Sequence, residues 1–250
     1  MDNDEKLLIS KCEDLFRLCD KYCAPRFSDF FDGGEQALIR DKVVFPFEYN
    51  VMFFGGFDDA EKKIMGVFPQ WEEPDENEFP IACLKIEGGF SRKLTHRDYL
   101  GTIMSLGLTS SKLGDIVVGD GFACVLLNRD IAAYTADNLH KIGNQGVKVK
   151  IIDDLSVIKI ERQYKTINAV CAGSRLDAIV GAAANISRSQ ASSLITGGKV
   201  KLNHRETDKT AVTVKEGDLI SIRGYGRFIL HSFDGETRKM RMHITLKQYI

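Results

Sequence analysis

Residues 187–203 read SRSQASSLITGGKVKLN, and this pattern predicts a helix, a glycine turn and a strand. Ser187 suits the N-cap of the helix, because its hydroxyl can accept a hydrogen bond from a free backbone amide of the first turn. The glycine pair at 197–198 ends the helix, since glycine tolerates the left-handed conformation. Cations and apolar residues then alternate over residues 199–202, as in a half-buried strand. The stretch therefore predicts a compact unit with one apolar side and one cationic side.

Cations concentrate in and around this stretch. They are Arg188, Lys199, Lys201, Arg205 and Lys209, and His204 is a further polar residue expected on the same side. Residues 174–250 contain 13 Lys/Arg and 7 Asp/Glu, a balance of +6, whereas residues 1–173 contain 21 and 28, a balance of −7. A basic C-terminal part joined to an acidic body indicates a nucleic-acid-binding module on a different kind of domain. The phosphate backbone is the natural partner of the cationic side.

The length and composition of the chain limit the class of protein to which it can belong. A chain of 250 residues with 44% hydrophobic and 28% charged residues suits two or three globular domains. The sequence shows no signal peptide and no apolar run long enough to span a bilayer, and its acidic start argues against a transit peptide. The six cysteines form no Cys-x-x-Cys pair, so the ligand set of a zinc site is incomplete. We therefore expect a cytoplasmic protein with reduced thiols, without metal or cofactor, and without membrane contact.

We predict an α+β protein of three domains. They are an N-terminal mixed α/β domain (1–77), a middle domain (78–155) and a C-terminal domain (156–250). The N-terminal domain is expected to begin with an amphipathic helix over 5–23 and to hold one or two short helices around the Gly33-Gly34 break, within 29–44. The acidic, proline-containing segment 71–80 marks the boundary to the middle domain.

The middle domain has the element order β-α-β-β-α-β, which is typical of a ferredoxin-like or RNA-recognition-motif-like sandwich. Its predicted elements are 81–88, 96–108, 114–120, 121–128, 129–143 and 147–153, with a hairpin turn at 119–121. An RNA-recognition motif stacks bases on aromatic residues of its central strands. Here those strands offer Ala82, Leu84, Ile86, Ala123, Val125 and Leu127, with Phe122 at one end. We therefore expect a scaffold, or a surface that binds the RNA backbone through Arg92, Lys93, Lys148 and Lys150.

The C-terminal domain adds a second helix and more strands to the opening stretch. A helix is expected to start at Arg175-Leu176-Asp177, and strand, turn and strand are expected over 211–223. Asp234-Gly235 lies between two alternating runs and predicts the turn of a final hairpin. The second arm of that hairpin carries Arg238, Lys239 and Arg241, which extend the basic surface.

Several of these segments resemble known families. RLDAIV, SRSQASSLITGGKVKLN and DKTAVTVKEGDLISIRGYGRF, within residues 174–230, resemble the RNA-binding domain first described in small-subunit ribosomal protein four, here called the S-four domain. FPFEYNVMFFGGFDDAEKKIMGVFP, HRDYLGTIMSLGLTSSKLGDIVV and CAGSRLDAIV together resemble the YlmH-type bacterial proteins. This resemblance implies an N-terminal domain, an RNA-recognition-like middle domain and a C-terminal S-four domain, in which two helices lie against a small sheet.

The resemblance also implies a set of RNA-binding residues. Position by position, they are Arg175, Ser187, Arg188, Gln190, Lys199, Asn203, Lys209 and Arg223. The cationic pattern adds Lys201 and Arg205. Arg188, in the first turn of a helix, can fork onto a phosphate while adjacent amides point the same way. Arg175 is expected either to contact RNA or to pair with Asp177 or Asp218 and brace the fold.

The YlmH-type resemblance implies a non-catalytic, monomeric protein that docks on structured rRNA or tRNA on the large ribosomal subunit, in the rescue of stalled ribosomes. Two other classes stay open. Arg175-Leu176-Asp177 is similar to the catalytic triplet of pseudouridine synthases that carry S-four domains, which would make the protein an RNA-modifying enzyme. However, the triplet lies at the start of the S-four domain rather than in a large catalytic domain after it. The third class is a cell-division-associated adaptor protein.

Overall fold

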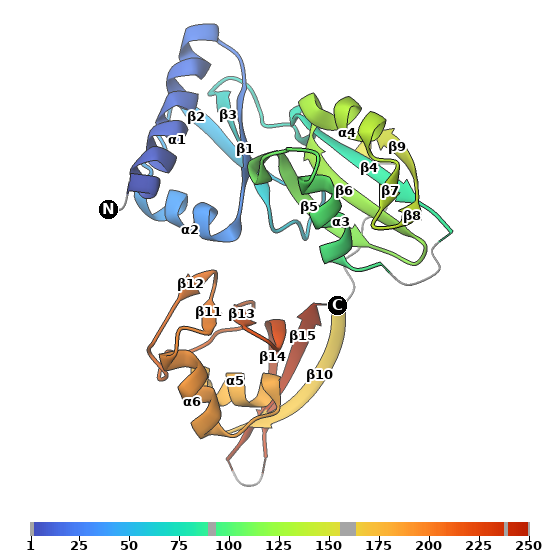
Figure 1. The fold of residues 1–250 in the computed structure, drawn as a ribbon. Coiled ribbons are helices and arrows are strands. Elements are labelled where there is room, and N and C mark those ends of the chain that lie inside the picture. Colours follow the sequence, from blue (N-terminus) through green and yellow to red (C-terminus); the bar gives the residue numbers. More distant parts are fainter. Residues whose placement is uncertain (1–2, 90–93, 156–163, 238–239, 250) are drawn as a thin grey trace. The chain divides into compact units, whose positions relative to one another are not determined.

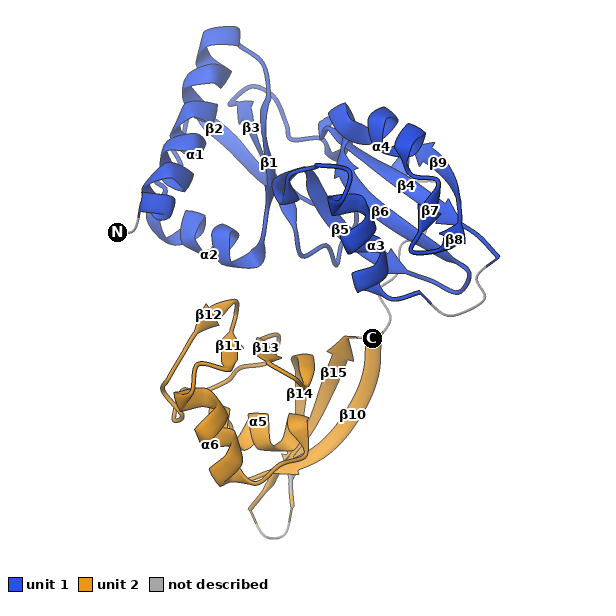
Figure 2. Cartoon of the chain, viewed as in Figure 1, with its two compact units in different colours: residues 1–161 blue, residues 162–250 orange. Residues whose placement is uncertain are grey.

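The chain divides between residues 161 and 162 into two units, each with hydrophobic cores of its own (Figure 2). The computed structural model describes residues 3–89, 94–155, 164–237 and 240–249. The strand pairs described are all antiparallel. The helices and strands form the predicted α+β architecture.

The first part of unit 1 is a three-stranded sheet with two helices on one face (Figure 1). Its elements are α1 (Asn3–Tyr22), β1 (Arg26–Phe31), α2 (Gly33–Lys42), β2 (Tyr49–Phe54) and β3 (Lys63–Pro69), with the strand order β1-β3-β2. The apolar stripe of α1, including Leu8, Cys12 and Phe16, packs against Met65 and Val67 of β3. The predicted N-terminal amphipathic helix is therefore confirmed.

The glycine pair at 33–34 begins a helix rather than interrupting one. The carboxylate of Asp32 accepts a hydrogen bond from the backbone N–H of Glu35 (2.9 Å), and the carboxylate of Glu35 accepts one from the N–H of Asp32 (2.7 Å). This capping box satisfies two backbone donors of the first turn and fixes the start of α2. One helix forms in residues 29–44, as predicted, but residues 26–31 before it form a strand that was not predicted.

The second part of unit 1 has the predicted β-α-β-β-α-β order. Its main elements are β4 (Ile81–Glu87), α3 (His96–Met104), β5 (Leu113–Val118), β6 (Phe122–Asn128), α4 (Ala132–Asn138) and β9 (Lys148–Ile152). The strand order β5-β6-β4-β9 is that of a ferredoxin-like sheet. The hairpin at 119–121 is confirmed by a hydrogen bond from the N–H of Gly119 to the carbonyl of Phe122 (2.9 Å). A small hairpin, β7 (Lys141–Ile142) and β8 (Gln145–Gly146), makes α4 shorter than predicted.

Unit 1 consists of four layers. Helices α3 and α4 cover one face of the β5-β6-β4-β9 sheet, where Leu84 and Val125 meet Tyr99 and Ile103. The opposite face packs on the three-stranded sheet through an aromatic cluster, and α1 and α2 cover the far side. The main members of this cluster are Phe30, Phe68, Phe79, Ile81, Cys83, Cys124 and Leu126. The proposed boundary between residues 77 and 78 thus falls inside one unit, and the division into three domains at the predicted residues stays a prediction.

Unit 2 is a six-stranded sheet with two helices on one face (Figure 1). Its elements are β10 (Tyr164–Cys171), α5 (Leu176–Ala184), α6 (Arg188–Thr196), β11 (Val200–Leu202), β12 (Arg205–Glu206), β13 (Leu219–Ile222), β14 (Gly226–Glu236) and β15 (Met242–Tyr249). The strand order is β10-β15-β14-β13-β11-β12. Leu176, Ile179 and Ile195 of the helices pack on Ile220 and Phe228 of the sheet. The predicted helix–turn–strand over 187–203 is confirmed.

The final hairpin turns later than predicted. Asp234 and Gly235 lie within β14, at the register shift between Phe233 and Gly235 in its pairing with β15, and the φ of +109° at Gly235 serves this irregular strand rather than a turn. Strand β14 continues to Glu236 and β15 begins at Met242, and the N–H of Thr237 donates to the carbonyl of Arg241 (2.7 Å). Residues 211–214 form no regular strand. Arg238, Lys239, Arg92 and Lys93 lie outside the described residues.

Candidate nucleic-acid interface

Two arginines converge on one buried carboxylate at the start of the two helices of unit 2. Arg175 donates to both oxygens of Asp177 (3.2 and 3.1 Å), and Arg188 donates to the same two oxygens (3.0 and 3.2 Å). The Asp177 side chain is 5% exposed, whereas those of Arg175 and Arg188 are 48% and 53% exposed. Each guanidinium is thus held by one edge and keeps the remainder of its donors toward water. The network carries a net charge of +1.

The two arginines keep Asp177 ionised. Burial by itself raises the pKa of this carboxyl, but hydrogen bonds from Arg175 and Arg188 outweigh it, and the pKa of Asp177 lies below its ordinary value of 3.8. Asp177 therefore stays negative near neutral pH and fixes the position of both guanidiniums. Sequence reasoning anticipated the Arg175–Asp177 pair but missed the pair with Arg188.

Backbone geometry brings these groups together. Asn185 ends α5 in the left-handed conformation (φ +53°), so the chain turns at once into α6. The loop before β13 docks on the start of α5, where the N–H of Leu176 donates to the carbonyl of Val212 (2.8 Å) and that of Asp177 to Thr210 (3.1 Å). Lys209 is exposed next to Thr210 in this loop, so the fold places it close to the arginine network.

Ser187 and Gln190 form the cap of α6. The hydroxyl of Ser187 accepts from the N–H of Gln190 (3.2 Å), and the side-chain oxygen of Gln190 accepts from the N–H of Ser187 (3.0 Å). This is a capping box, which satisfies backbone donors at the start of the helix. This cap fixes the start of α6, so that Arg188 lies in its first turn. An RNA contact by Ser187 or Gln190 stays a prediction.

We expect Ser187→Ala to lower the free energy of unfolding by about 1 kcal/mol, because an N-cap hydroxyl is worth about that much. Ser187→Gly should cost only a few tenths, since glycine is itself an accepted N-cap. Urea unfolding of the three proteins measures the difference. If Ala and Gly had equal effects on stability, the hydroxyl would not be acting as the cap.

A second group of the predicted residues lies at the end of β11 and β13. The N–H of Arg223 donates to the carbonyl of Lys199 (2.9 Å), so these exposed residues are neighbours across the two strands. Lys201 faces away from the core and pairs with Glu206 (3.5 Å), and Arg205 is exposed on the adjoining strand. This end of the sheet is therefore cationic, with one carboxylate partly compensating it.

Asn203 has a bracing role. Its φ is +48°, its amide nitrogen donates to Asp218 (2.8 Å), and its carbonyl oxygen accepts from the N–H of Leu219 (2.9 Å). Both groups hold the turn after β11 against the start of β13, and an RNA contact by this exposed side chain stays a prediction. This turn also helps to hold β11, the strand that carries Lys201, against β13.

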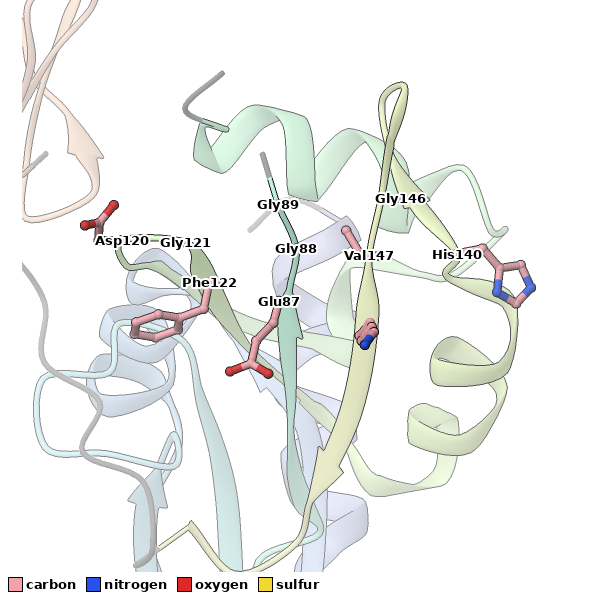
Figure 3. Close-up of a pocket in the computed structure, with 10 residues that line it drawn as sticks. Glu87, Gly88, Gly89, Asp120, Gly121, Phe122, His140, Gly146 and Val147 are labelled. Atoms are coloured by element: carbon pink, nitrogen blue, oxygen red, sulfur yellow. The ribbon is translucent and has the colours of Figure 1, made fainter. Parts of the chain in front are cut away.

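Unit 1 offers a smaller polar surface at one end of its four-stranded sheet, shown in Figure 3. Lys85 pairs with Glu87 (2.6 Å) and lies over the ring of Phe122 (5.8 Å). Lys148 and Lys150 are exposed on β9, opposite Glu87 and Lys85. The adjoining pocket is lined by Glu87, Gly88, Gly89, Asp120, Gly121, Phe122, His140, Gly146, Val147 and Lys148. Its mixed charge makes it a weaker candidate for RNA than the arginine network.

Within residues 3–89, 94–155, 164–237 and 240–249, no group of three His, Cys, Asp or Glu side chains is arranged to hold a metal ion. No helix in the described part of the chain is long and apolar enough to cross a membrane.

Comparisons with known proteins agree with this geometry. The family described as "Putative RNA-binding domain in YlmH" matches residues 74–155, and the S4 domain, which is the S-four domain named above, matches residues 174–220. The ribosome-associated protein quality control protein P2 of Bacillus subtilis is 29% identical over 252 residues, which cover 98% of this chain and 95% of that protein. A solved structure titled cell division protein ylmH from Streptococcus pneumoniae shares the fold, with a TM-score of 0.52. It is 17% identical and covers 64% of this chain and 97% of that chain.

Fold and site thus define an RNA-binding protein in which an S4 domain follows an RNA-recognition-like domain. Its middle part is similar to the RNA-binding domain described in YlmH, and its C-terminal part is similar to the S4 domain.

Proposed function

We propose that this protein is a non-catalytic RNA-binding factor that docks on structured rRNA or tRNA on the large ribosomal subunit, during rescue of stalled ribosomes. The observation that carries the proposal is the pair of half-exposed guanidiniums held by Asp177. The match to a relative named as a ribosome-associated quality control protein supports the ribosomal setting. A monomeric, cytoplasmic protein without a cofactor is part of the same proposal.

The network acts by preorganisation. A guanidinium presents several donors in a rigid plane, and this geometry matches phosphate oxygens. Because Asp177 holds each plane in place, little side-chain freedom is lost when a phosphate binds. Lys209 adds a positive charge beside the network, and Lys199 and Arg223 add two more at the end of β11 and β13. Cations of this kind contact the RNA backbone and read the shape of a folded RNA rather than its sequence.

The position of Asp177 favours a non-catalytic role. A carboxylate that attacks a base must present an oxygen to the substrate, but both oxygens of Asp177 already accept two hydrogen bonds each, and the side chain is 5% exposed. The Arg175-Leu176-Asp177 triplet is therefore better explained as a brace for the RNA face than as the catalytic triplet of a modification enzyme.

We expect Arg188→Ala to weaken binding to deacylated tRNA or a structured rRNA fragment by about tenfold, and to lower the salt slope of the binding constant by about one, because one phosphate contact is lost. Fluorescence anisotropy over a salt series measures both quantities. The matched control is Lys11→Ala, which removes one exposed cation from the acidic unit 1. If Arg188→Ala had the same affinity and the same salt slope as the parent, the RNA would bind to a face of the protein that does not include Arg188.

Sedimentation of cell lysate tests the ribosomal setting of the same proposal. The parent protein should travel with large subunits at low salt and leave them at high salt, and Arg188→Ala should leave them at lower salt than the parent. Nuclease treatment that left the protein bound to a protein partner would favour the adaptor class instead.

A further inference from the structure

The helix-free face of the six-stranded sheet carries a second cluster of cations, together with aromatic rings. Tyr164 of β10 and Tyr249 of β15 are register partners, and their rings meet edge to face, with centroids 5.1 Å apart at 73°. The guanidinium of Arg227 lies over the ring of Tyr249 at 4.9 Å, and the ammonium of Lys247 lies over the ring of Tyr164 at 5.9 Å. All four residues are half-buried.

Strand register shows that these side chains face away from the helices. Side chains alternate between the two faces along a strand. Phe228, Leu230, Ile244 and Leu246 belong to the core under α5 and α6, so their neighbours Arg227, Lys247 and Tyr249 lie on the opposite face.

The cluster continues across the sheet as a row. Lys201 pairs in register with Ser221, and Ser221 pairs with Arg227. The row therefore runs Lys201, Ser221, Arg227, Tyr249 and Tyr164, over β11, β13, β14, β15 and β10. Four steps between neighbouring strands, at about 4.8 Å each, give a length of about 19 Å. Such a row can contact several nucleotides of an extended strand.

The charge of this face fits a polyanion. Strands β10, β13 and β15, and β14 up to Phe233, contain no Asp or Glu, and Arg227 and Lys247 lie on this face. Glu206 pairs with Lys201, and Asp234 accepts hydrogen bonds from Ser232 and Thr245 at the other end of β14 and β15.

We propose that the row from Lys201 to Tyr164 binds an unpaired RNA segment that extends from the structured RNA held by Arg175 and Arg188. This inference rests on the RNA-binding role proposed above and adds a second surface with a different preference. Arginine planes and aromatic rings stack on bases, and this is possible only where the bases are not already stacked in a duplex. The cations in the same row neutralise the phosphates between the bases.

The test compares two RNA probes, one hairpin with a single-stranded tail of about ten nucleotides and the same hairpin without it, the tail length being within the range of known single-strand sites. The parent protein should bind the tailed hairpin about tenfold more tightly. The double variant Tyr164→Ala, Tyr249→Ala should lose that gain and keep its affinity for the plain hairpin. The double variant with Phe at both positions keeps the rings and should keep the gain, which separates stacking from loss of fold.

The outcomes separate this inference from the proposed function. If the tail gave the parent no gain, or if the Ala variant kept it, the row would not bind unpaired RNA, although binding of the plain hairpin would stand. If Arg188→Ala bound the plain hairpin as tightly as the parent, the proposed function would fail, whatever the tail contributes. Circular dichroism of the Ala variant checks that unit 2 is folded, and Arg227→Ala, which keeps both rings, should reduce the salt slope for the tailed probe only.

Discussion

Asp177→Asn is expected to weaken RNA binding by about tenfold, although it makes the RNA-binding unit more positive. The parent carboxylate accepts four hydrogen bonds from Arg175 and Arg188. An asparagine offers one oxygen without charge, so at least one guanidinium loses its hold and must be ordered when RNA binds. A purely electrostatic view predicts the opposite sign, because every added positive charge strengthens attraction to phosphate.

The matched control is Asp208→Asn. It makes the same charge change at an exposed position in the loop beside the network. We expect this variant to bind structured RNA as tightly as the parent or slightly more tightly. Anisotropy with the same RNA, at a temperature where both variants are folded, compares the two. Equal behaviour of Asp177→Asn and Asp208→Asn would show that the carboxylate does not position the arginines.

Loss of the same carboxylate should also lower the free energy of unfolding by about 2 kcal/mol. This is less than the usual cost of breaking a buried ion pair, because about half of each arginine side chain is exposed and remains solvated. The folded-state pKa of Asp177 is below its ordinary value of 3.8, so its contribution is complete above that value and is lost as pH falls through the folded-state pKa. The stability difference between the parent and Asp177→Asn should therefore be constant near neutral pH and narrow below about pH 4.

Local signals in the sequence explain why the helix–turn–strand of unit 2 could be predicted. Ser187 and the glycines at 197–198 act within a few residues, and their effects do not depend on the rest of the fold. The Arg188–Asp177 pair joins residues from different helices, and its geometry depends on how α5 and α6 cross. The Tyr164–Tyr249 pair depends on strand register over a long separation. Contacts of this kind leave no periodic pattern in the sequence, so they could not be predicted from it.

The ferredoxin-like sheet of unit 1 is packed against other elements on both of its faces. The sequence-based prediction considered the set that includes Leu84 and Val125 for base stacking and favoured a scaffold instead, and in the structure this set packs under α3 and α4. Cys83, Cys124 and Leu126 form the other face and contact the aromatic cluster. A signal was present, because residues 81–84 of β4 and 123–127 of β6 are apolar at both alternating sets of positions, and this pattern indicates a sheet buried on both faces. The predicted scaffold role fits this burial, since base stacking is blocked over most of the sheet.

Phe79→Ala is expected to lower the free energy of unfolding of unit 1 by about 3–5 kcal/mol, the usual cost of truncating a buried phenylalanine. Phe79 is 2% exposed, and its ring meets those of Phe27 (5.0 Å), Phe54 (5.4 Å) and Phe68 (6.1 Å). It lies where the two sheets of unit 1 pack together, so neighbouring rings cannot collapse into the space without moving a sheet. The loss is a large part of the stability of an ordinary domain.

The control for this variant is Phe47→Ala, which removes the same side chain from a position that is 82% exposed and should change stability by less than about 0.5 kcal/mol. Urea unfolding measures the free energies, and hydrogen exchange read by mass spectrometry assigns them to segments. Because unit 2 has a core of its own, exchange in residues 164–237 and affinity for the hairpin RNA should be unchanged in Phe79→Ala. Faster exchange across both units would mean that they unfold together, and the RNA face would then depend on the packing of unit 1.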